Sequence, residues 1–403
     1  MGEGGSSAIN LGTPIPVANV TCSTDPTLDS SLNGTTPAPN ASWNNDSPSS
    51  TGVISRKDLT GVPVAVGYMF HPAVGTAQAL LVLFSGGDGT TGITADPNTG
   101  TPTSNGNNFL VRSADLFAAQ GYDVVTIDEP TDEPPYPVSS GYDPYRTSMR
   151  HAVDISPVIN DVNKNHPNTT TLPVQLAGTS RGAISVVSNY MLTSGVALFS
   201  PVTSGGGMPV GAANSPANVQ PAYVKVPVQV SWNTHDNCGV SVPANWRSLA
   251  AAFHNAAVGT AAVAIRGGFG DFSAACNAVT YHGYFGIESC SVQQETDWMA
   301  GVVTALGTSN MRPQAMAVTA TTAMNTSTQI DLSMSASDGD GDILRYALPY
   351  MGTSLGGTLA LSGSRVTYTP PTGVSGTDGT FGYVVNDGKG GAANNLVRVT
   401  LMP

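Results

Sequence analysis

The sequence predicts an α/β domain with a mainly parallel sheet, followed by a small all-β domain. Between about residues 62 and 306, apolar strand-like runs alternate with amphipathic helical segments. That alternation is typical of a parallel sheet covered by helices on both faces. After Pro313 the pattern changes to short alternating strands separated by Gly and Asp turns, which predicts a β-sandwich of roughly 90 residues.

Each element follows from a local pattern. The run ALLVLFSG (79–86) is continuously apolar, as expected of a strand buried on both faces. The segment 144–161 has helical periodicity, but Pro157 within it should kink or split a helix. Further strands are expected over YDVVTID (122–128), LPVQLAG (172–178), GVALFSP (195–201), VPVQVSW (226–232) and AAVAIRG (261–267), and helices over 107–121, 181–192, 243–256 and 291–307.

The domain division rests on composition. Residues 1–50 are rich in Ser, Thr, Asn, Pro and Gly, and they hold too few large apolar groups to offset the entropy of ordering. We therefore expect a low-complexity arm over 1–50, the α/β domain over 51–308 and the β-sandwich over 313–403. The opening MGEGGSSAIN lacks the basic and apolar regions of a signal peptide, so we expect a chain whose leader has been removed.

Charge and cysteine content exclude several function classes. The net charge is −12 and no basic residues cluster, which argues against a nucleic-acid partner. No apolar run approaches the roughly 20 residues that a membrane helix needs. The four cysteines show no zinc-site spacing, and disulfides in a secreted or cell-surface protein are the better interpretation. They are Cys22, Cys238, Cys276 and Cys290.

A candidate nucleophile stands in Gly178-Thr179-Ser180-Arg181-Gly182. This G-x-S-x-G pattern places a serine on a tight turn between a strand and a helix, and Ser180 has that context. The second match, around Ser354, lies in the β-rich tail without a following helix. The alternative interpretation of Ser180 is an ordinary helix N-cap.

A nucleophilic serine needs a histidine to take its proton and an acid to orient that histidine. His282 lies in the loop between the last expected strand and the last helix, where serine–acid–histidine order requires the base. His254 lies inside a helical run and is interpreted as a packed or surface residue. Asp236 follows the strand that ends near 232 and is the favoured acid, with Asp271 as its rival.

An oxyanion hole needs backbone N–H groups, and glycine-rich turns suit it. The donor after the nucleophile would be Arg181. The turn FSGGDGTTG (84–92) should supply the second donor, with Gly87 or Asp88 as candidates. The alternative is a plain flexible turn.

Cys238 lies two residues after the acid candidate, and Cys276 lies six before the histidine candidate. If both loops meet in one site, these sulfurs should be close. A bridge closing a loop of about 39 residues would stabilise the protein by about 4 kcal/mol. Two unrelated buried thiols and a Cys276–Cys290 bridge are the alternatives. In the favoured pairing, a second bridge from Cys22 would tie down the N-terminal arm.

Three segments, LAGTSRGAISV, DNCGVSVPANW and CNAVTYHGYFGIE, resemble a group of exported bacterial α/β-hydrolases. The segments NFLVRSADLFAAQGYDVVTIDEPTD and RHAVDISPVI also fit, so the resemblance covers roughly residues 60–305. It implies an α/β-hydrolase fold, ester hydrolysis, a Ser180–Asp236–His282 triad and a Cys238–Cys276 bridge. Many relatives carry two adjacent acids before the cysteine, whereas this chain reads Asp236-Asn237.

The tail resembles bacterial Ig-like or cadherin-like domains in SASDGDGDILRYAL and VTYTPPTGVSGTDGTFGYVVNDGKGG. Asp338, Asp340 and Asp342 alternate in a Gly-rich turn and are weak candidates for calcium ligands. The EF-hand spacing is not met, and a polar hairpin is the alternative. We expect no other cofactor.

Together these patterns predict a secreted serine esterase with a C-terminal Ig-like domain. Every candidate catalytic residue precedes residue 308, so the domain should be dispensable for hydrolysis of small esters. Appended β-domains are common on enzymes that act on polymers, which favours a polymeric ester such as a polyester. The alternatives are a non-catalytic surface or adhesion protein on a hydrolase scaffold, and a peptidase of the same fold.

Overall fold

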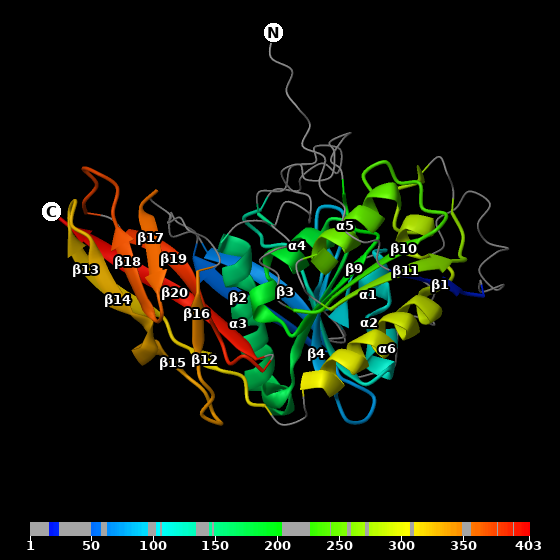
Figure 1. The fold of residues 1–403 in the computed structure, drawn as a ribbon, viewed down its shortest axis with the longest axis horizontal. Helices are drawn as coiled ribbons and strands as arrows, with labels where there is room; N and C mark the ends of the chain where they lie inside the picture. The colour runs from blue at the N-terminus through cyan, green and yellow to red at the C-terminus, as the bar shows by residue number, and fades with distance from the viewer. Residues whose placement is uncertain are drawn as a thin grey trace, which may run out of the picture.

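A nine-stranded sheet forms the centre of the computed structural model, in the order β1-β11-β10-β9-β8-β4-β7-β3-β2 (Figure 1). Within this sheet β3 alone runs in the direction opposite to the other strands. The strands are β1 (Val17–Thr21), β2 (Ser50–Lys57), β3 (Pro63–His71), β4 (Ala79–Phe84), β7 (Tyr122–Ile127), β8 (Val174–Thr179), β9 (Gly195–Phe199), β10 (Val228–Asn233) and β11 (Thr260–Arg266). The structure describes residues 16–23, 50–57, 63–95, 102–104, 107–133, 145–146, 149–203, 226–241, 243–255, 259–270, 274–306, 310–348, 356–376, 378–389 and 391–403.

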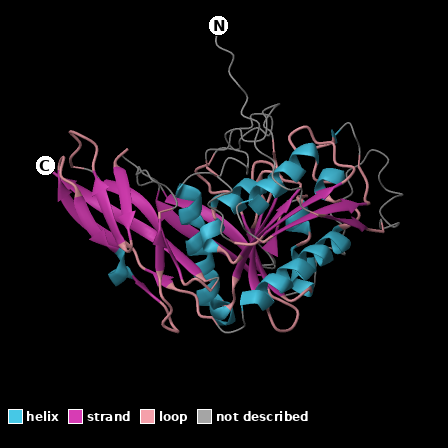
Figure 2. Cartoon of the chain, viewed as in Figure 1, coloured by secondary structure: helices cyan, strands magenta, loops and turns pink. Residues whose placement is uncertain are grey.

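Helices cover both faces of the sheet (Figures 1 and 2), because the central strands are apolar on both sides. One face packs against α1 (Phe109–Arg112), α2 (Ala114–Ala119) and α6 (Glu288–Leu306). The other packs against α3 (Met149–Asn165), α4 (Gly182–Ser188) and α5 (Pro243–Asn255). The predicted α/β architecture is confirmed. The short strands β5 (Thr94–Ala95) and β6 (Pro102–Thr103) pair separately.

Two helical predictions need correction. The segment 107–121 forms two short helices that meet at Ser113 rather than one. Helix α3 continues through Pro157 and is not split there. Proline inside a helix costs about 3 kcal/mol or more. Ile155, Val158 and Val162 of α3 are wholly buried in the core, and this packing offsets the cost.

The predicted N-terminal arm contains a strand of the main sheet. Val17–Thr21 forms β1 and pairs in parallel with β11 at the sheet edge. The Cys22 N–H then donates to the Arg266 carbonyl at 2.8 Å, and a Cys22–Cys290 disulfide joins β1 to α6. The composition of 1–50 concealed this element because a five-residue strand is short. Pairing with β11 and the Cys22–Cys290 disulfide hold this strand in place.

The C-terminal part is a β-sandwich, as predicted. One sheet has the order β13-β20-β19-β16 and the other β14-β18-β17. Tyr368, Phe381, Tyr383 and Val397 are fully buried in its core. The strands are β12 (Gln314–Ala315), β13 (Val318–Ala323), β14 (Thr328–Asp331), β15 (Ala336–Ser337), β16 (Arg345–Ala347), β17 (Thr358–Ser362), β18 (Arg365–Thr369), β19 (Asp378–Asn386) and β20 (Ala392–Met402).

The sandwich lies against α3 and is not separated from the α/β domain by open solvent (Figure 1). Val384 of β19 belongs to the same buried core as Ile159 of α3. Arg312 donates to the Thr169 carbonyl at 2.7 Å and to Asn163 Oδ1 at 2.8 Å. Burial lowers the pKa of Arg312 to about 10, so the side chain is charged at neutral pH. A buried, hydrogen-bonded cation at this point fixes how the two domains meet.

We predict that Arg312→Met lowers the Tm by several degrees. The substitution leaves buried carbonyls without a donor, which costs about 1–3 kcal/mol. Differential scanning calorimetry measures the change, and Arg365→Met, which removes an exposed pair with Asp331, is the control. A Tm equal to that of wild type would show that the interface does not contribute to stability.

A buried acid lies beneath the sheet. Glu295 of α6 is fully buried, and this burial raises its pKa well above the usual carboxyl value. It hydrogen-bonds with Ser231, and the Gln229 amide also faces it. Burial of this kind disfavours the charged form of a carboxyl.

This predicts a pH-dependent stability. Because the folded pKa is raised, the contribution of Glu295 is fully present below the ordinary carboxyl pKa and is lost as pH rises toward the folded pKa. Glu295→Gln cannot ionise, so its Tm should exceed that of wild type by a margin that grows with pH. Thermal unfolding followed by circular dichroism across pH tests this, with the exposed Asp297→Asn of the same helix as control. Parallel Tm–pH curves for wild type and Glu295→Gln would contradict it.

Candidate active site

Ser180 lies on the turn between β8 and α4 in a strained conformation. Its φ is 53°, in the left-handed region that non-glycine residues rarely adopt. Such a conformation costs about 1–3 kcal/mol and persists only where surrounding structure imposes it. Here the Ser180 N–H donates to the Phe199 carbonyl at 2.9 Å, and the Ser180 carbonyl accepts from the Val202 N–H at 3.2 Å. The turn is thereby attached to the end of β9.

The two motif glycines are needed because backbones pass too closely for a side chain. A Cβ on Gly178 would overlap the carbonyl of Gly182, and a Cβ on Gly182 would overlap the carbonyl of Phe84 at the end of β4. A Cβ on Gly86 would lie 2.9 Å from the Cβ of Ser180. The turn therefore brings β4, β8 and α4 into direct contact, with Ser180 at their junction.

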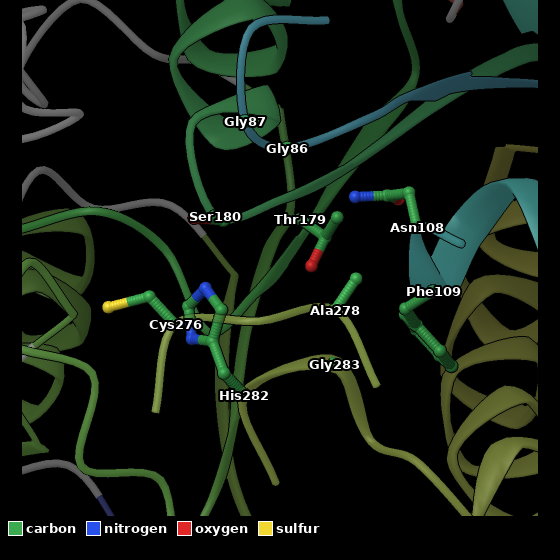
Figure 3. A pocket seen from close by; sticks show the side chains of 10 residues that line it. All are labelled: Gly86, Gly87, Asn108, Phe109, Thr179, Ser180, Cys276, Ala278, His282 and Gly283. Carbon is green, nitrogen blue, oxygen red and sulfur yellow. The ribbon is translucent and has the colours of Figure 1, made fainter. Parts of the chain in front are cut away.

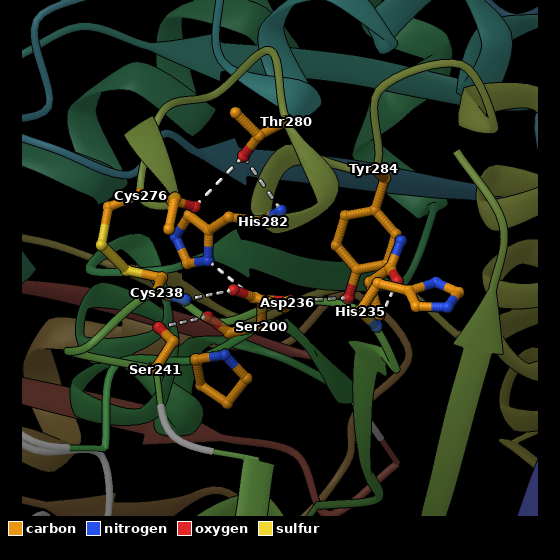
Figure 4. A network of polar contacts seen from close by, with 12 residues as sticks. Ser200, His235, Asp236, Cys238, Ser241, Cys276, Thr280, His282 and Tyr284 are labelled. Atoms are coloured by element: carbon orange, nitrogen blue, oxygen red, sulfur yellow. Dashed lines mark hydrogen bonds and ion pairs between the residues drawn. A yellow bond between two sulfur atoms is a disulfide. The ribbon is translucent and has the colours of Figure 1, made fainter. Parts of the chain in front are cut away.

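His282 and Asp236 form a buried hydrogen-bonded pair (Figure 4). His282 Nδ1 donates to Asp236 Oδ2 at 2.8 Å. The other carboxylate oxygen accepts from the Cys238 N–H at 2.8 Å, and Thr280 Oγ1 accepts from the His282 N–H at 3.2 Å. With the proton on Nδ1, the lone pair is on Nε2. The arrangement can hold a histidine ready to accept a proton.

Ser180 and His282 line one pocket with a volume of about 190 Å³ (Figure 3). In the part of the chain that the structure describes, no lining side chain carries a permanent charge. A neutral substrate group therefore fits the pocket better than an ionised one. The lining residues are Gly86, Gly87, Asn108, Phe109, Thr179, Ser180, Cys276, Ala278, His282 and Gly283.

The structure separates the three oxyanion candidates. Gly87 lines the pocket and has a φ of 66°. Asp88 does not line it, and its carboxylate instead accepts from the Thr90 N–H at 3.1 Å. Arg181 follows the serine and precedes the first residue of α4, with its side chain buried outside the lining. Only its backbone N–H is suited to the proposed role.

Asn108 was not identified from the sequence. Its Oδ1 accepts from the Leu110 N–H at 3.1 Å and caps α1. This directs the amide nitrogen the other way, toward the loop of Gly86 and Gly87 (Figure 3). Asn before a helical run indicates a cap, but the sequence does not show that the cap also faces a pocket.

The rival candidates Ser354 and Asp271 lie outside the described residues. His254 is exposed in the last turn of α5.

Two disulfides pair all four cysteines. Cys238–Cys276 joins the loop of Asp236 to the loop of His282, and Cys276 also lines the pocket (Figures 3 and 4). Cys22–Cys290 is the second bridge, so the alternative Cys276–Cys290 pairing is wrong. The first bridge holds the acid and histidine loops together directly.

We predict that removing the first bridge loosens these loops before the sheet unfolds. In the double variant Cys238→Ala/Cys276→Ala, backbone amides of 236–241 and 274–287 should exchange with deuterium faster, while those of β4 and β8 stay protected. Hydrogen exchange with mass spectrometry measures this. The double variant Cys22→Ala/Cys290→Ala is the control, because it should affect β1 instead. Unchanged exchange in both loops would refute the restraining role.

Carboxylates also gather in the C-terminal domain. Oxygen atoms of Asp338, Asp342 and Asp387 lie within 4.8 Å of one another, so Asp387 rather than Asp340 completes the group. Asp338 Oδ1 accepts from the N–H groups of Asp340 and Asp342 at 3.1 and 3.0 Å. Lys389 Nζ lies 2.6 Å from Asp342 Oδ1 and supplies positive charge. Calcium binding by Asp338, Asp340 and Asp342 stays a prediction.

Comparisons with known proteins concern the fold. Residues 310–400 match the bacterial Ig domain family, and no curated protein sequence matches the chain. Similar solved structures include brefeldin A esterase, a bacterial homologue of human hormone sensitive lipase (13% identity, 64% of this chain, 78% of that chain, TM-score 0.40). Esterase LipW from Mycobacterium marinum is also similar (15% identity, 66% of this chain, 84% of that chain, TM-score 0.39). So is an acylaminoacyl peptidase from Pyrococcus horikoshii (13% identity, 66% of this chain, 43% of that chain, TM-score 0.39).

No helix among the described residues has the length and apolar character needed to cross a bilayer. The sheet order, the helices on both faces and the serine turn after β8 are those of a hydrolase sheet. The chain thus consists of an α/β-hydrolase fold followed by a C-terminal bacterial Ig domain.

Proposed function

We propose that the protein is a serine hydrolase that cleaves carboxylic esters, with Ser180 as nucleophile, His282 as general base and Asp236 as the acid that orients it. One observation carries the proposal. A strained serine and a histidine held by a buried carboxylate at 2.8 Å line the same pocket. The two disulfides and the bacterial Ig domain indicate an extracytoplasmic bacterial protein.

In the first half of the reaction, Ser180 Oγ attacks the ester carbonyl carbon while His282 Nε2 takes the hydroxyl proton. Asp236 stabilises the imidazolium that forms. The carbonyl π electrons move to the oxygen, giving a tetrahedral oxyanion. The intermediate then collapses, the bond to the alcohol oxygen breaks, and His282 returns the proton to the leaving alcohol.

In the second half, water attacks the acyl-serine. His282 Nε2 takes a proton from the water, and a second oxyanion forms at the same position. Its collapse breaks the bond to Ser180 Oγ, which regains its proton from His282, and the carboxylic acid leaves. No cofactor takes part in either half.

The oxyanion needs N–H donors aimed at the pocket. We assign the backbone N–H groups of Gly87 and Arg181 to this role. Asn108 supports the assignment, since its side-chain amide nitrogen faces the same glycine loop. Asp88 is not part of the assignment because its side chain bonds within its own turn.

The strain at Ser180 favours an enzyme over a non-catalytic scaffold. A glycine at this position would remove the cost, and unlike Ser200 this strained serine lines a pocket together with the His282–Asp236 pair. A peptidase of the same fold is the remaining alternative, because amides and esters use the same residues. Polymeric esters such as polyesters are our proposed substrates, given the attached Ig domain.

We predict that Ser180→Ala lowers kcat for a short chromogenic ester by about 10⁴-fold or more, since loss of a nucleophile removes the acyl-enzyme route. The Tm should not fall, because alanine keeps the fold and is no larger than serine. Activity equal to wild type in Ser180→Ala would exclude this mechanism. Ser200→Ala is a matched control, since Ser200 also has a positive φ, of 40°, but does not line the pocket.

A panel of acetyl to long-chain esters, a chromogenic peptide amide and a solid polyester film separates the substrate classes. Turnover of amides at a rate comparable to esters would favour the peptidase alternative.

A further inference from the structure

We infer that the Arg112–Glu288 ion pair positions the histidine loop against α1 and thereby sets the place of His282 in the pocket. This inference rests on the proposed function of that site. Neither residue lines the pocket, so each acts through others as a positioning residue.

Arg112 binds the histidine loop on both sides of His282. Its guanidinium donates to the Ala278 carbonyl at 3.1 Å and to the Gly283 carbonyl at 2.5 Å. Ala278 and Gly283 both line the pocket, and Gly283 is adjacent to the histidine. One planar group with several N–H donors therefore spans the loop that carries the base.

Glu288 completes the arrangement from the helix that follows the loop. Its Oε1 accepts from Arg112 Nε at 2.9 Å, and its Oε2 accepts from the Gly286 N–H at 2.9 Å. The carboxylate thus connects the guanidinium to the loop between His282 and α6. Both ends of the loop are held by a single pair of charges.

Through α1, the ion pair is also connected to the opposite wall of the pocket. Arg112 is the last residue of α1, whose first turn includes Phe109 and whose cap is Asn108. Phe109 and Asn108 both line the pocket (Figure 3). A shift of Arg112 would therefore move the histidine loop and the facing wall relative to each other. Misplacement of about 1 Å in such geometry costs on the order of 10²-fold in rate.

The pair is held firmly because it is buried. Arg112 and Glu288 side chains are 3% and 10% exposed, and the guanidinium lies 5.7 Å from the centre of the Phe285 ring and 5.8 Å from that of Phe109. Burial lowers the pKa of Arg112, and the charge of Glu288 opposes that shift. A buried arginine that spans two carbonyls and a carboxylate cannot be replaced by lysine without losing part of the network.

A matched control lies elsewhere in the same chain. Arg312 is also a buried arginine that donates to backbone carbonyls, but it bonds to residues around 163–170 and not to the pocket. Substituting either arginine with methionine removes the same chemical group. Only the substitution at Arg112 should affect the position of His282.

The test compares full-length wild type with Arg112→Lys, Arg112→Met, Glu288→Gln and Arg312→Met. Five quantities are measured: kcat and KM on a short soluble ester, the rate at which a fluorophosphonate labels Ser180, the Tm, and the low-field proton NMR signal of the His282–Asp236 hydrogen bond. Arg112→Met should lower kcat and the labelling rate by on the order of 10²-fold, with KM changed only a few-fold, because it displaces His282 rather than the bound substrate. Arg112→Lys should recover part of the loss.

Arg312→Met should lower the Tm and leave kcat and labelling unchanged. The inference would be overturned if Arg112→Met had the same kcat and labelling rate as wild type. It would also be overturned if kcat and the labelling rate fell in proportion to the Tm in both Arg112→Met and Arg312→Met. If Arg112→Met does not fold, the kcat and labelling rates of Arg112→Lys and Glu288→Gln decide the test. A wild type that reacts with fluorophosphonate but hydrolyses no ester would refute the proposed substrate class, and labelling and NMR would still test the positioning.

Discussion

The site depends on a steric constraint where β4, β8 and α4 meet. Gly178 and Gly182 allow these backbones to approach so closely that Ser180 has no room for an ordinary turn. Hydrogen bonds to the end of β9 then hold its unfavourable φ. The burial of β4 and β8 on both faces supplies the rigidity, because strain of this size persists only where its surroundings cannot relax. The strained conformation of Ser180 therefore depends on the packing of the whole sheet.

The histidine is held by different means. It stands on a loop and a short 3₁₀ turn, which have little rigidity of their own. A disulfide restrains this loop from the side of Asp236, and an ion pair restrains it from the side of α1. One restraint is covalent and acts at Cys276, and the other is electrostatic and acts at Ala278 and Gly283 on either side of the base. Loops carry catalytic groups well only when such contacts limit their motion.

The elements of the fold were predictable where local pattern decides them. Apolar runs such as 79–84 and 174–179 appear as fully buried strands because both faces meet helices. The pattern failed where packing outweighs local preference: α3 tolerates Pro157, and β1 is ordered by a parallel neighbour and a disulfide rather than by its composition. The sequence pattern likewise did not predict the contact of the Ig domain with α3, because that contact joins residues far apart in the sequence.

For the candidate site, the sequence by itself determined the residue types and their order: a serine between glycines, then an acid, then a histidine, with cysteines beside the last two. These follow from motif and spacing. Only the tertiary structure decided that Asp236 meets His282 at 2.8 Å, that Gly87 rather than Asp88 lines the pocket, that Asn108 lines it too, and that Arg112 contacts the histidine loop. Such relations depend on contacts between segments far apart in the sequence, 46 residues for Asp236 and His282 and 166 for Arg112 and Ala278, and no local pattern encodes them.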